Sequence, residues 1–171
     1  MVDSLLLAAA LMGCGGTPME THVPISRSRS YTRAVDTLGA ETVVSAGAAR
    51  VWAVLPAVYT DLGLHINFRN PEERRTGTCY QPVRGRLGKE LLSAYVDCGE
   101  TRAVPNADRH EVALTVLSTV IPIDERTTTI RTYVLGVGVD ATGVSQQRIW
   151  CFSRGALEER IRAAVEERAG G

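Results

Sequence analysis

The sequence predicts an α+β fold, an antiparallel β-sheet with one helix from the N-terminal half and a C-terminal helix packed on one face. Two observations support this prediction: alternating β-branched runs at residues 111–139, and an apolar helical period at 51–62 and again at 157–165. Consecutive strands joined by short polar turns pair antiparallel, and helices before and after them cover one face of the sheet.

The first helix is expected to open at Gly47, after a short β-like run at residues 41–45. Its apolar face recurs at helical spacing through Val51, Leu55, Val58 and Leu62, and Gly63 is a suitable stop. Pro56 lies inside this pattern, and proline removes a backbone donor and clashes with the preceding turn. A kink or a break is therefore expected there, or two short helices with Pro56 in the first turn of the second.

A β-hairpin is the firmest strand prediction. Val112 to Val120 and Thr127 to Val139 alternate β-branched residues and flank a short polar turn. Gly136 and Gly138 share one face of the second strand, which indicates close packing of another element, for which a helix is preferred to a ligand. Weaker strands are expected at residues 65–70 and, after a turn at Asn70-Pro71, in a second segment that ends at Cys79. A loop is expected at 80–90, followed by strands at Leu91 to Cys98 and at Gln147 to Cys151.

The C-terminal helix is predicted from the apolar spacing of Leu157, Ile161, Ala164 and Val165. Glu158 and Glu159 suit the positive N-terminal end of this helix. Glu158 and Arg162 are four residues apart, so we expect an ion pair between them.

Residues 11–14 read Leu-Met-Gly-Cys and follow a short apolar run. They resemble the lipobox of bacterial lipoproteins, in which the cysteine receives a diacylglycerol thioether and becomes the mature N-terminus. The resemblance implies a signal peptide at 1–13, a lipidated Cys14 with a flexible tether at 14–40, and one folded domain at 41–171. Gly15 after the cysteine favours the outer membrane, facing the periplasm, if the cell has one.

Two further resemblances concern the domain. The order of its elements, with the lipobox, resembles the helix-grip domains of lipoproteins in the outer-membrane barrel assembly machinery. Asp97-Cys98-Gly99 and the stretch from Cys151 to Glu158 are similar to segments of an uncharacterised lipoprotein family of environmental bacteria. That resemblance covers residues 41–166 and implies no activity.

Three cysteines remain beyond Cys14, and an exported protein tends to form disulfides. We favour Cys98–Cys151, which would join the end of a strand to the start of the terminal helix and leave Cys79 reduced. Cys79–Cys98 is the alternative.

No catalytic motif, metal-ligand spacing or cofactor fingerprint occurs in the sequence. The formal charge is balanced, so nucleic acid is not an expected partner. Two function classes remain: an interaction module that docks on another envelope protein, and a lipid or small-molecule carrier. A carrier would have a pocket between sheet and helix, lined by Trp52, Tyr59 and Tyr133, whereas an interaction module would have a filled core and an exposed apolar patch.

Overall fold

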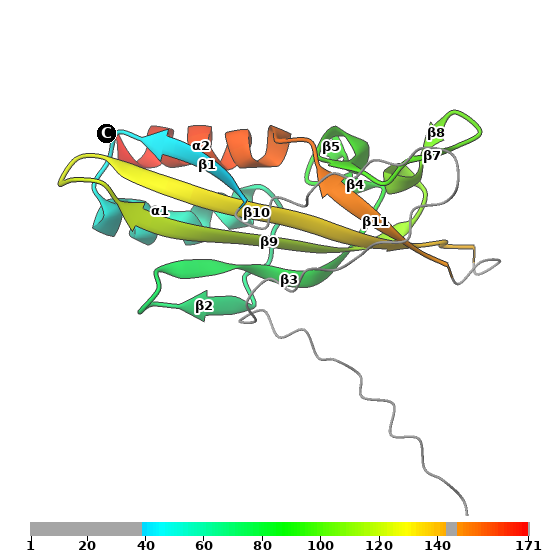
Figure 1. The fold of residues 1–171 in the computed structure, drawn as a ribbon, viewed down its shortest axis with the longest axis horizontal. Coiled ribbons are helices and arrows are strands. Elements are labelled where there is room, and N and C mark those ends of the chain that lie inside the picture. The colour runs from blue at the N-terminus through cyan, green and yellow to red at the C-terminus, as the bar shows by residue number, and fades with distance from the viewer. Residues whose placement is uncertain (1–38, 143–146, 171) are drawn as a thin grey trace, which may run out of the picture. The chain divides into compact units, whose positions relative to one another are not determined.

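The computed structural model describes residues 39–142 and 147–170, and it confirms the α+β class. A large antiparallel sheet stands in front of two helices in Figure 1. The elements are β1 (Ala40–Val44), α1 (Ala48–Asp61), β2 (Phe68–Asn70), β3 (Arg75–Arg84), β4 (Arg86–Leu87), β5 (Glu90–Leu91), β6 (Val96–Asp97), β7 (Glu100–Thr101), β8 (Val104–Pro105), β9 (Glu111–Pro122), β10 (Thr128–Val139), β11 (Arg148–Ser153) and α2 (Ala156–Ala169).

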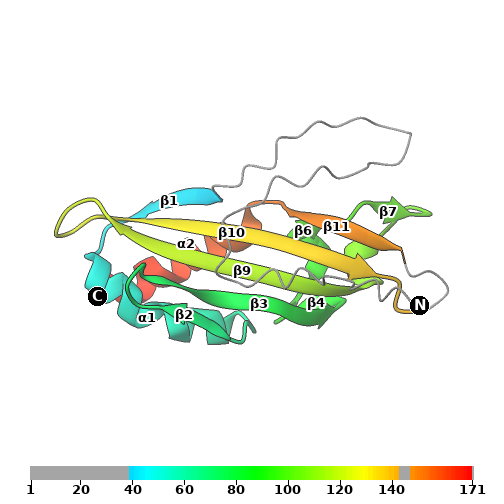
Figure 2. The ribbon, with the colours of Figure 1, turned by 60° about the horizontal axis from the view of Figure 1, so that its bottom comes forward.

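The hairpin of β9 and β10 forms the centre of the sheet, here called the spine, and the sequence predicts this hairpin. The two strands pair antiparallel along their whole length, from Thr128 opposite Pro122 to Val139 opposite Glu111. The sheet order is β2-β3-β9-β10-β11-β6 (Figure 2). β1 and β11 share the free edge of β10, because β1 pairs with residues 128–132 and β11 with residues 135–139. The chain therefore enters the domain in the middle of this edge.

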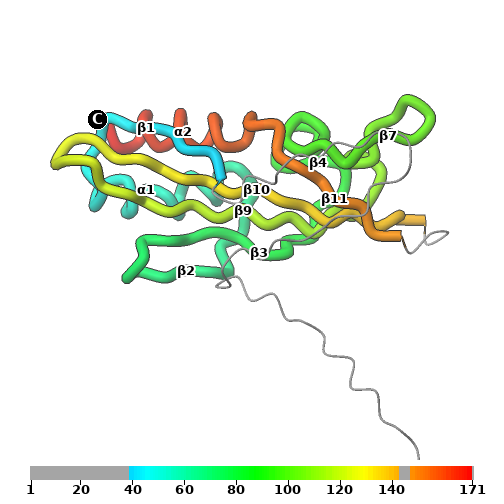
Figure 3. The backbone as a smooth tube through the Cα atoms, viewed as in Figure 1, coloured from blue at the N-terminus to red at the C-terminus, as the bar shows by residue number. Residues whose placement is uncertain are grey.

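Both helices pack on one face of the sheet, and the backbone trace in Figure 3 shows them behind β9 and β10. The even-numbered residues of β9 and β10 point toward the helices because side chains alternate along a strand. Fully buried residues from both layers make one core, among them Val51, Leu55, Val58, Leu114, Val116, Ile130, Leu157, Ile161 and Val165. The expected core positions of both helices are confirmed, apart from the partly buried Leu62 and Ala164.

α1 runs through Pro56 as one helix, so the alternative of two short helices is wrong. Pro56 is half-buried, whereas Val51, Leu55 and Val58 are buried against the core. Proline costs about 3 kcal/mol inside a helix, and burial of such side chains repays a cost of that size, at roughly 1.5–3 kcal/mol each. Tertiary packing thus overrides the local preference for a break.

Two expectations are wrong at residues 80–98, the loop at 80–90 and the strand at 91–98. β3 continues to Arg84, with a register shift between Thr78 and Gln81, where a loop was expected. Leu92–Ala94 form a 3-10 helix, and only Val96–Asp97 of the expected strand pair with β11. Leu92 and Tyr95 are both buried and stand three residues apart, which fits a tight helical turn as well as a strand.

The close packing expected at Gly136 and Gly138 involves the neighbouring strands, and both glycines lie on the face of β10 that points toward the helices. The nearest atoms to a Cβ built at Gly136 belong to Val112 and Cys151, on the two neighbouring strands. At Gly138 they belong to Ile149 and Cys151. The missing side chains therefore make room for the packing of β9 and β11 beside β10.

Candidate functional site

The three aromatic residues expected to line a pocket do not come together. Tyr59 is fully buried on α1, against the helix-facing side of the sheet. Tyr133 is half-buried on β10, in the alternation that faces away from the helices. Trp52 lies at the rim of α1, where the guanidinium of Arg69 stands 4.5 Å from its ring centroid. The arrangement therefore contains no joint aromatic pocket of these three side chains.

Tyr59 has a structural role in the core. Its hydroxyl lies 2.9 Å from Ser118 Oγ, which in turn lies 2.9 Å from Thr132 Oγ1. Burial raises the pKa of Tyr59, and the hydrogen bond with Ser118 offsets only part of that rise. The phenol is thus held neutral, and three buried hydroxyls satisfy one another between helix and sheet.

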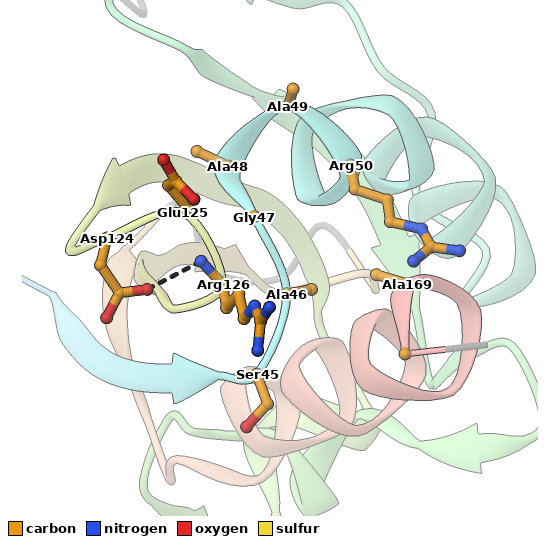
Figure 4. Close-up of a pocket in the computed structure, with 11 residues that line it drawn as sticks. Ser45, Ala46, Gly47, Ala48, Ala49, Arg50, Asp124, Glu125, Arg126 and Ala169 are labelled. Carbon is orange, nitrogen blue, oxygen red and sulfur yellow. Dashed lines mark hydrogen bonds between the residues drawn. The ribbon is translucent and has the colours of Figure 1, made fainter.

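Two hollows lie on the described surface. One of ≈ 570 Å³ opens to solvent beside the start of α1 and the β9–β10 turn (Figure 4). Its lining consists of Ser45, Ala46, Gly47, Ala48, Ala49, Arg50, Asp124, Glu125, Arg126, Ala169 and Gly170. A second, of ≈ 250 Å³, is lined by Asp61, Leu62, Leu87, Gly88, Lys89, Glu90, Tyr95 and Arg160. Neither is an enclosed apolar cavity of the kind that a carrier needs.

Apolar side chains also gather on the side of the sheet that points away from α1 and α2, here called the open face. Figure 1 looks onto it. Alternation and strand register assign to it the half-buried or exposed side chains of Val43, Phe68, Tyr80, Ile121, Tyr133, Leu135, Val137, Trp150 and Phe152, and the buried Leu117. A sheet with one solvated face normally carries polar residues there. The open face therefore has the composition of a contact surface.

The environment of Tyr133 on the open face is partly desolvated. Burial and, secondarily, the nearby Tyr80 raise the pKa of Tyr133. Tyr80 itself is 49% exposed, and its backbone N–H donates to Thr115 Oγ1 across 3.2 Å. Arg131 and Glu41 form an ion pair of 2.5 Å between β10 and β1 on this face. Aromatic side chains in the middle and charged pairs at the side are typical of protein interfaces.

Sequence reasoning named only Tyr133 among the open-face residues. A signal was nevertheless present, because Tyr133, Leu135 and Val137 follow one another on the second face of β10. A strand that is apolar on both faces is expected to be covered on both faces.

The disulfide Cys98–Cys151 is confirmed. Its Cα atoms lie 4.1 Å apart, and both cysteines are buried on the helix side of the sheet. The bond joins the end of β6 to β11, just before α2, as expected from the sequence. Cys79 is also disulfide-bonded, so the expectation that Cys79 stays reduced is wrong. Cys14, the expected lipidation site, lies outside the described residues.

The expected ion pair of Glu158 with Arg162 is wrong. Glu158 is only 4% exposed, and its Oε1 accepts a 2.5 Å hydrogen bond from the Ser153 hydroxyl. Arg162 pairs instead with Glu159 and Glu166 on the outer side of α2. Glu158 Oε2 has no hydrogen-bond partner among the described residues. Ser153 also accepts from the Gly155 N–H at 2.9 Å, so the pair fixes the turn into α2.

Within residues 39–142 and 147–170, no group of three or more His, Cys, Asp or Glu side chains is placed to hold a metal ion. Neither α1 nor α2 has the length and apolar character of a membrane-crossing helix. The chain matches no protein-family model, no curated protein and no solved structure.

Proposed function

We propose that this protein is a membrane-anchored envelope lipoprotein whose folded domain works as a protein-interaction module, without catalysis. Cys14 would carry the lipid, and residues after it would connect the anchor to β1. The expected location is the outer membrane, facing the periplasm, if the cell has one. The partner would be another envelope protein.

The filled layer between sheet and helices is the observation that carries this proposal. Helix residues such as Leu55, Val58 and Ile161 are fully buried against the sheet. A carrier needs an apolar cavity of several hundred Å³ in that layer. The hollow of ≈ 570 Å³ opens to solvent and is lined by charged side chains and short residues. The geometry thus favours an interaction module over a carrier.

The open face supports the same proposal. Apolar and aromatic side chains gather there, and large exposed apolar patches mark interaction sites. Val43, at the side of this face, is 54% exposed. A protein partner that buries such residues would gain roughly 25 cal/mol for each Å² of apolar surface removed from water.

The anchor is tested by changing Cys14→Ser. The variant should leave the membrane fraction after a detergent-free wash, because the thioether has no sulfur on which to form. Thr17→Ser, in the same stretch, should stay membrane-bound and is the control. A Cys14→Ser protein that remains on the membrane would defeat the anchor proposal.

The mass of the Cys14 peptide gives a second test. One sulfur cannot hold a thioether and a disulfide together. Since Cys98 and Cys151 bond to each other and Cys79 is also disulfide-bonded, a lipidated Cys14 requires Cys79 to pair with a cysteine of another molecule. A diacylglycerol mass on Cys14 in protein purified from its native membrane supports the proposal. A peptide that links Cys14 to Cys79 contradicts it.

The interaction is tested by placing a charge on the open face. Val43→Asp and Ile121→Asp should abolish retention of an envelope partner that co-purifies with the wild-type protein. Glu166→Ala, on the outer side of α2, should leave retention unchanged. Equal retention by all three variants would argue against the open face as the docking surface, and a lipid or small molecule retained in native mass spectra would favour the carrier.

A further inference from the structure

The disulfide bond of Cys79 uses a sulfur that lies outside the described residues. Cys98 and Cys151 bond to each other, and Cys79 is bonded as well. The sequence contains one further cysteine, Cys14, and the proposed anchor places a thioether on its sulfur. With Cys14 lipidated, the bond of Cys79 must reach a second molecule. A second copy of this chain supplies a suitable sulfur, because it carries a Cys79 of its own.

Cys79 belongs to the open face, and its backbone is held in place there. It follows Gly77 by two residues along β3, so alternation places both on this face. β2 pairs only with residues 75–77 of β3, and beyond them the Asn67 side chain acts as the neighbouring strand. The Cys79 N–H donates to Asn67 Oδ1 at 2.8 Å, and Asn67 Nδ2 donates to the Cys79 carbonyl at 2.9 Å. The Cys79 side chain is only partly buried, and Tyr80 beside it is 49% exposed.

A row of side chains crosses the open face next to Cys79. Thr115, which accepts the Tyr80 N–H, lies in register with Leu135, and Leu135 lies in register with Phe152. Leu135 and Phe152 are half-buried. Two facing sheets pack about 10 Å apart, and a disulfide can span that gap, as it does in immunoglobulin domains. A bond between two Cys79 residues can therefore join two open faces and bury this row between them.

The charges of the protein permit such self-association. At the sides of the open face, Arg131 pairs with Glu41 and Arg154 pairs with Asp97, so these charges are compensated within one copy. The formal net charge of the chain is zero, and two copies therefore lack the mutual repulsion of strongly charged proteins. A patch that meets its own copy about a twofold axis forms a closed contact, which ends at two copies.

We propose that a second copy of this chain covers the open face, in a twofold dimer whose two Cys79 sulfurs are bonded. Two Cys79 thiols lose two protons and two electrons, and a disulfide oxidant of the oxidising compartment takes them up and becomes two thiols. An axis through the bond and across the strands lays each strand over its own copy, so Leu135 faces Leu135 of the second copy. This inference rests on the proposed lipid on Cys14 and names the protein that occupies the open face.

Non-reducing electrophoresis and peptide mapping of the full chain from its native membrane test the bond. The expected result is a dimer that reductant converts to monomer, with two Cys79 peptides linked to each other, and Cys79→Ser should abolish it. Cys79 alkylated as a thiol, or joined to a small thiol or to another protein, overturns the dimer while a lipid on Cys14 upholds the anchor. A peptide that links Cys14 to Cys79 contradicts the anchor itself, so the two failures are distinguishable.

A cysteine placed elsewhere on the open face tests how the two copies meet. In a Cys79→Ser background, Leu135→Cys should restore a reductant-sensitive dimer, because this position faces its own copy across the axis. Ala163 is exposed on α2, on the other side of the molecule, so Ala163→Cys is the matched control and should stay monomeric at the same concentration. Absence of the Leu135→Cys dimer, or equal crosslinking in the two variants, would overturn the face-to-face contact.

Discussion

At the scale of single residues, the sequence pattern does not predict the partners of buried polar side chains. Glu158 follows Leu157 at the start of α2 and has a basic residue four positions later, so the sequence favours a surface ion pair. The structure turns Glu158 inward because Ser153, in the preceding turn, offers a hydroxyl donor. Such a partner comes from the three-dimensional path of the chain, which helical spacing does not contain.

Changing Ser153→Ala should therefore lower the free energy of unfolding by about 1–3 kcal/mol, because a buried carboxylate loses its donor. Urea unfolding followed by circular dichroism measures this. Thr60→Ala removes an exposed hydroxyl that bonds to the Pro56 carbonyl, and it should cost much less. Equal losses in the two variants would mean that the Ser153–Glu158 contact contributes nothing specific.

Tyr59 predicts a dependence of stability on alkaline pH. Its pKa is raised in the folded protein, whereas a tyrosine in the unfolded chain titrates at about 10. Above that pH the unfolded state releases the proton and the folded state keeps it, so the free energy of unfolding falls by up to about 1.4 kcal/mol per pH unit. Below that pH the contribution of Tyr59 to the free energy of unfolding is fully present. Tyr59→Phe should show a shallower decline between about pH 10 and 11, and parallel curves would contradict the assignment.

At the scale of elements, the sequence predicted a strand or helix correctly where the apolar period repeats many times, and it failed where the period is short. The β9–β10 hairpin and α2 were predictable, because twelve-residue strands and a helix of fourteen residues repeat their pattern many times. Residues 91–98 alternate over too few positions to separate a strand from a tight turn. Alternation along β10 also placed Tyr133 opposite to Ile130 and Val134, which already argued against a pocket shared with Tyr59.

Docking of α2 is tested through its buried side. Leu157→Ala and Ile161→Ala should each cost about 2–5 kcal/mol, since both side chains are fully buried and truncation leaves a cavity. Glu166→Ala removes one surface ion pair with Arg162 and should cost less than about 1 kcal/mol. Thermal or urea unfolding measures all three. Similar small losses would show that α2 is loosely attached.

At the scale of the whole molecule, the disulfide Cys98–Cys151 ties together parts of the chain that are 53 residues apart. Loop closure of this size is expected to stabilise the fold by about 4 kcal/mol. The double variant Cys98→Ala/Cys151→Ala should lose roughly that amount in urea unfolding. A loss of less than about 1 kcal/mol would mean that packing alone holds β6 and α2 in place.

The position of the spine late in the chain has a consequence for biosynthesis. β1 has no partner strand until β10 exists, because it pairs with residues 128–132, and β3 has only the three-residue β2 as a partner until β9 follows. A ribosome adds residues from the N-terminus, so most of the chain must emerge before the sheet can close. During most of its synthesis such a chain has no closed sheet. An unfolded chain of this kind is what passage through a narrow membrane pore requires.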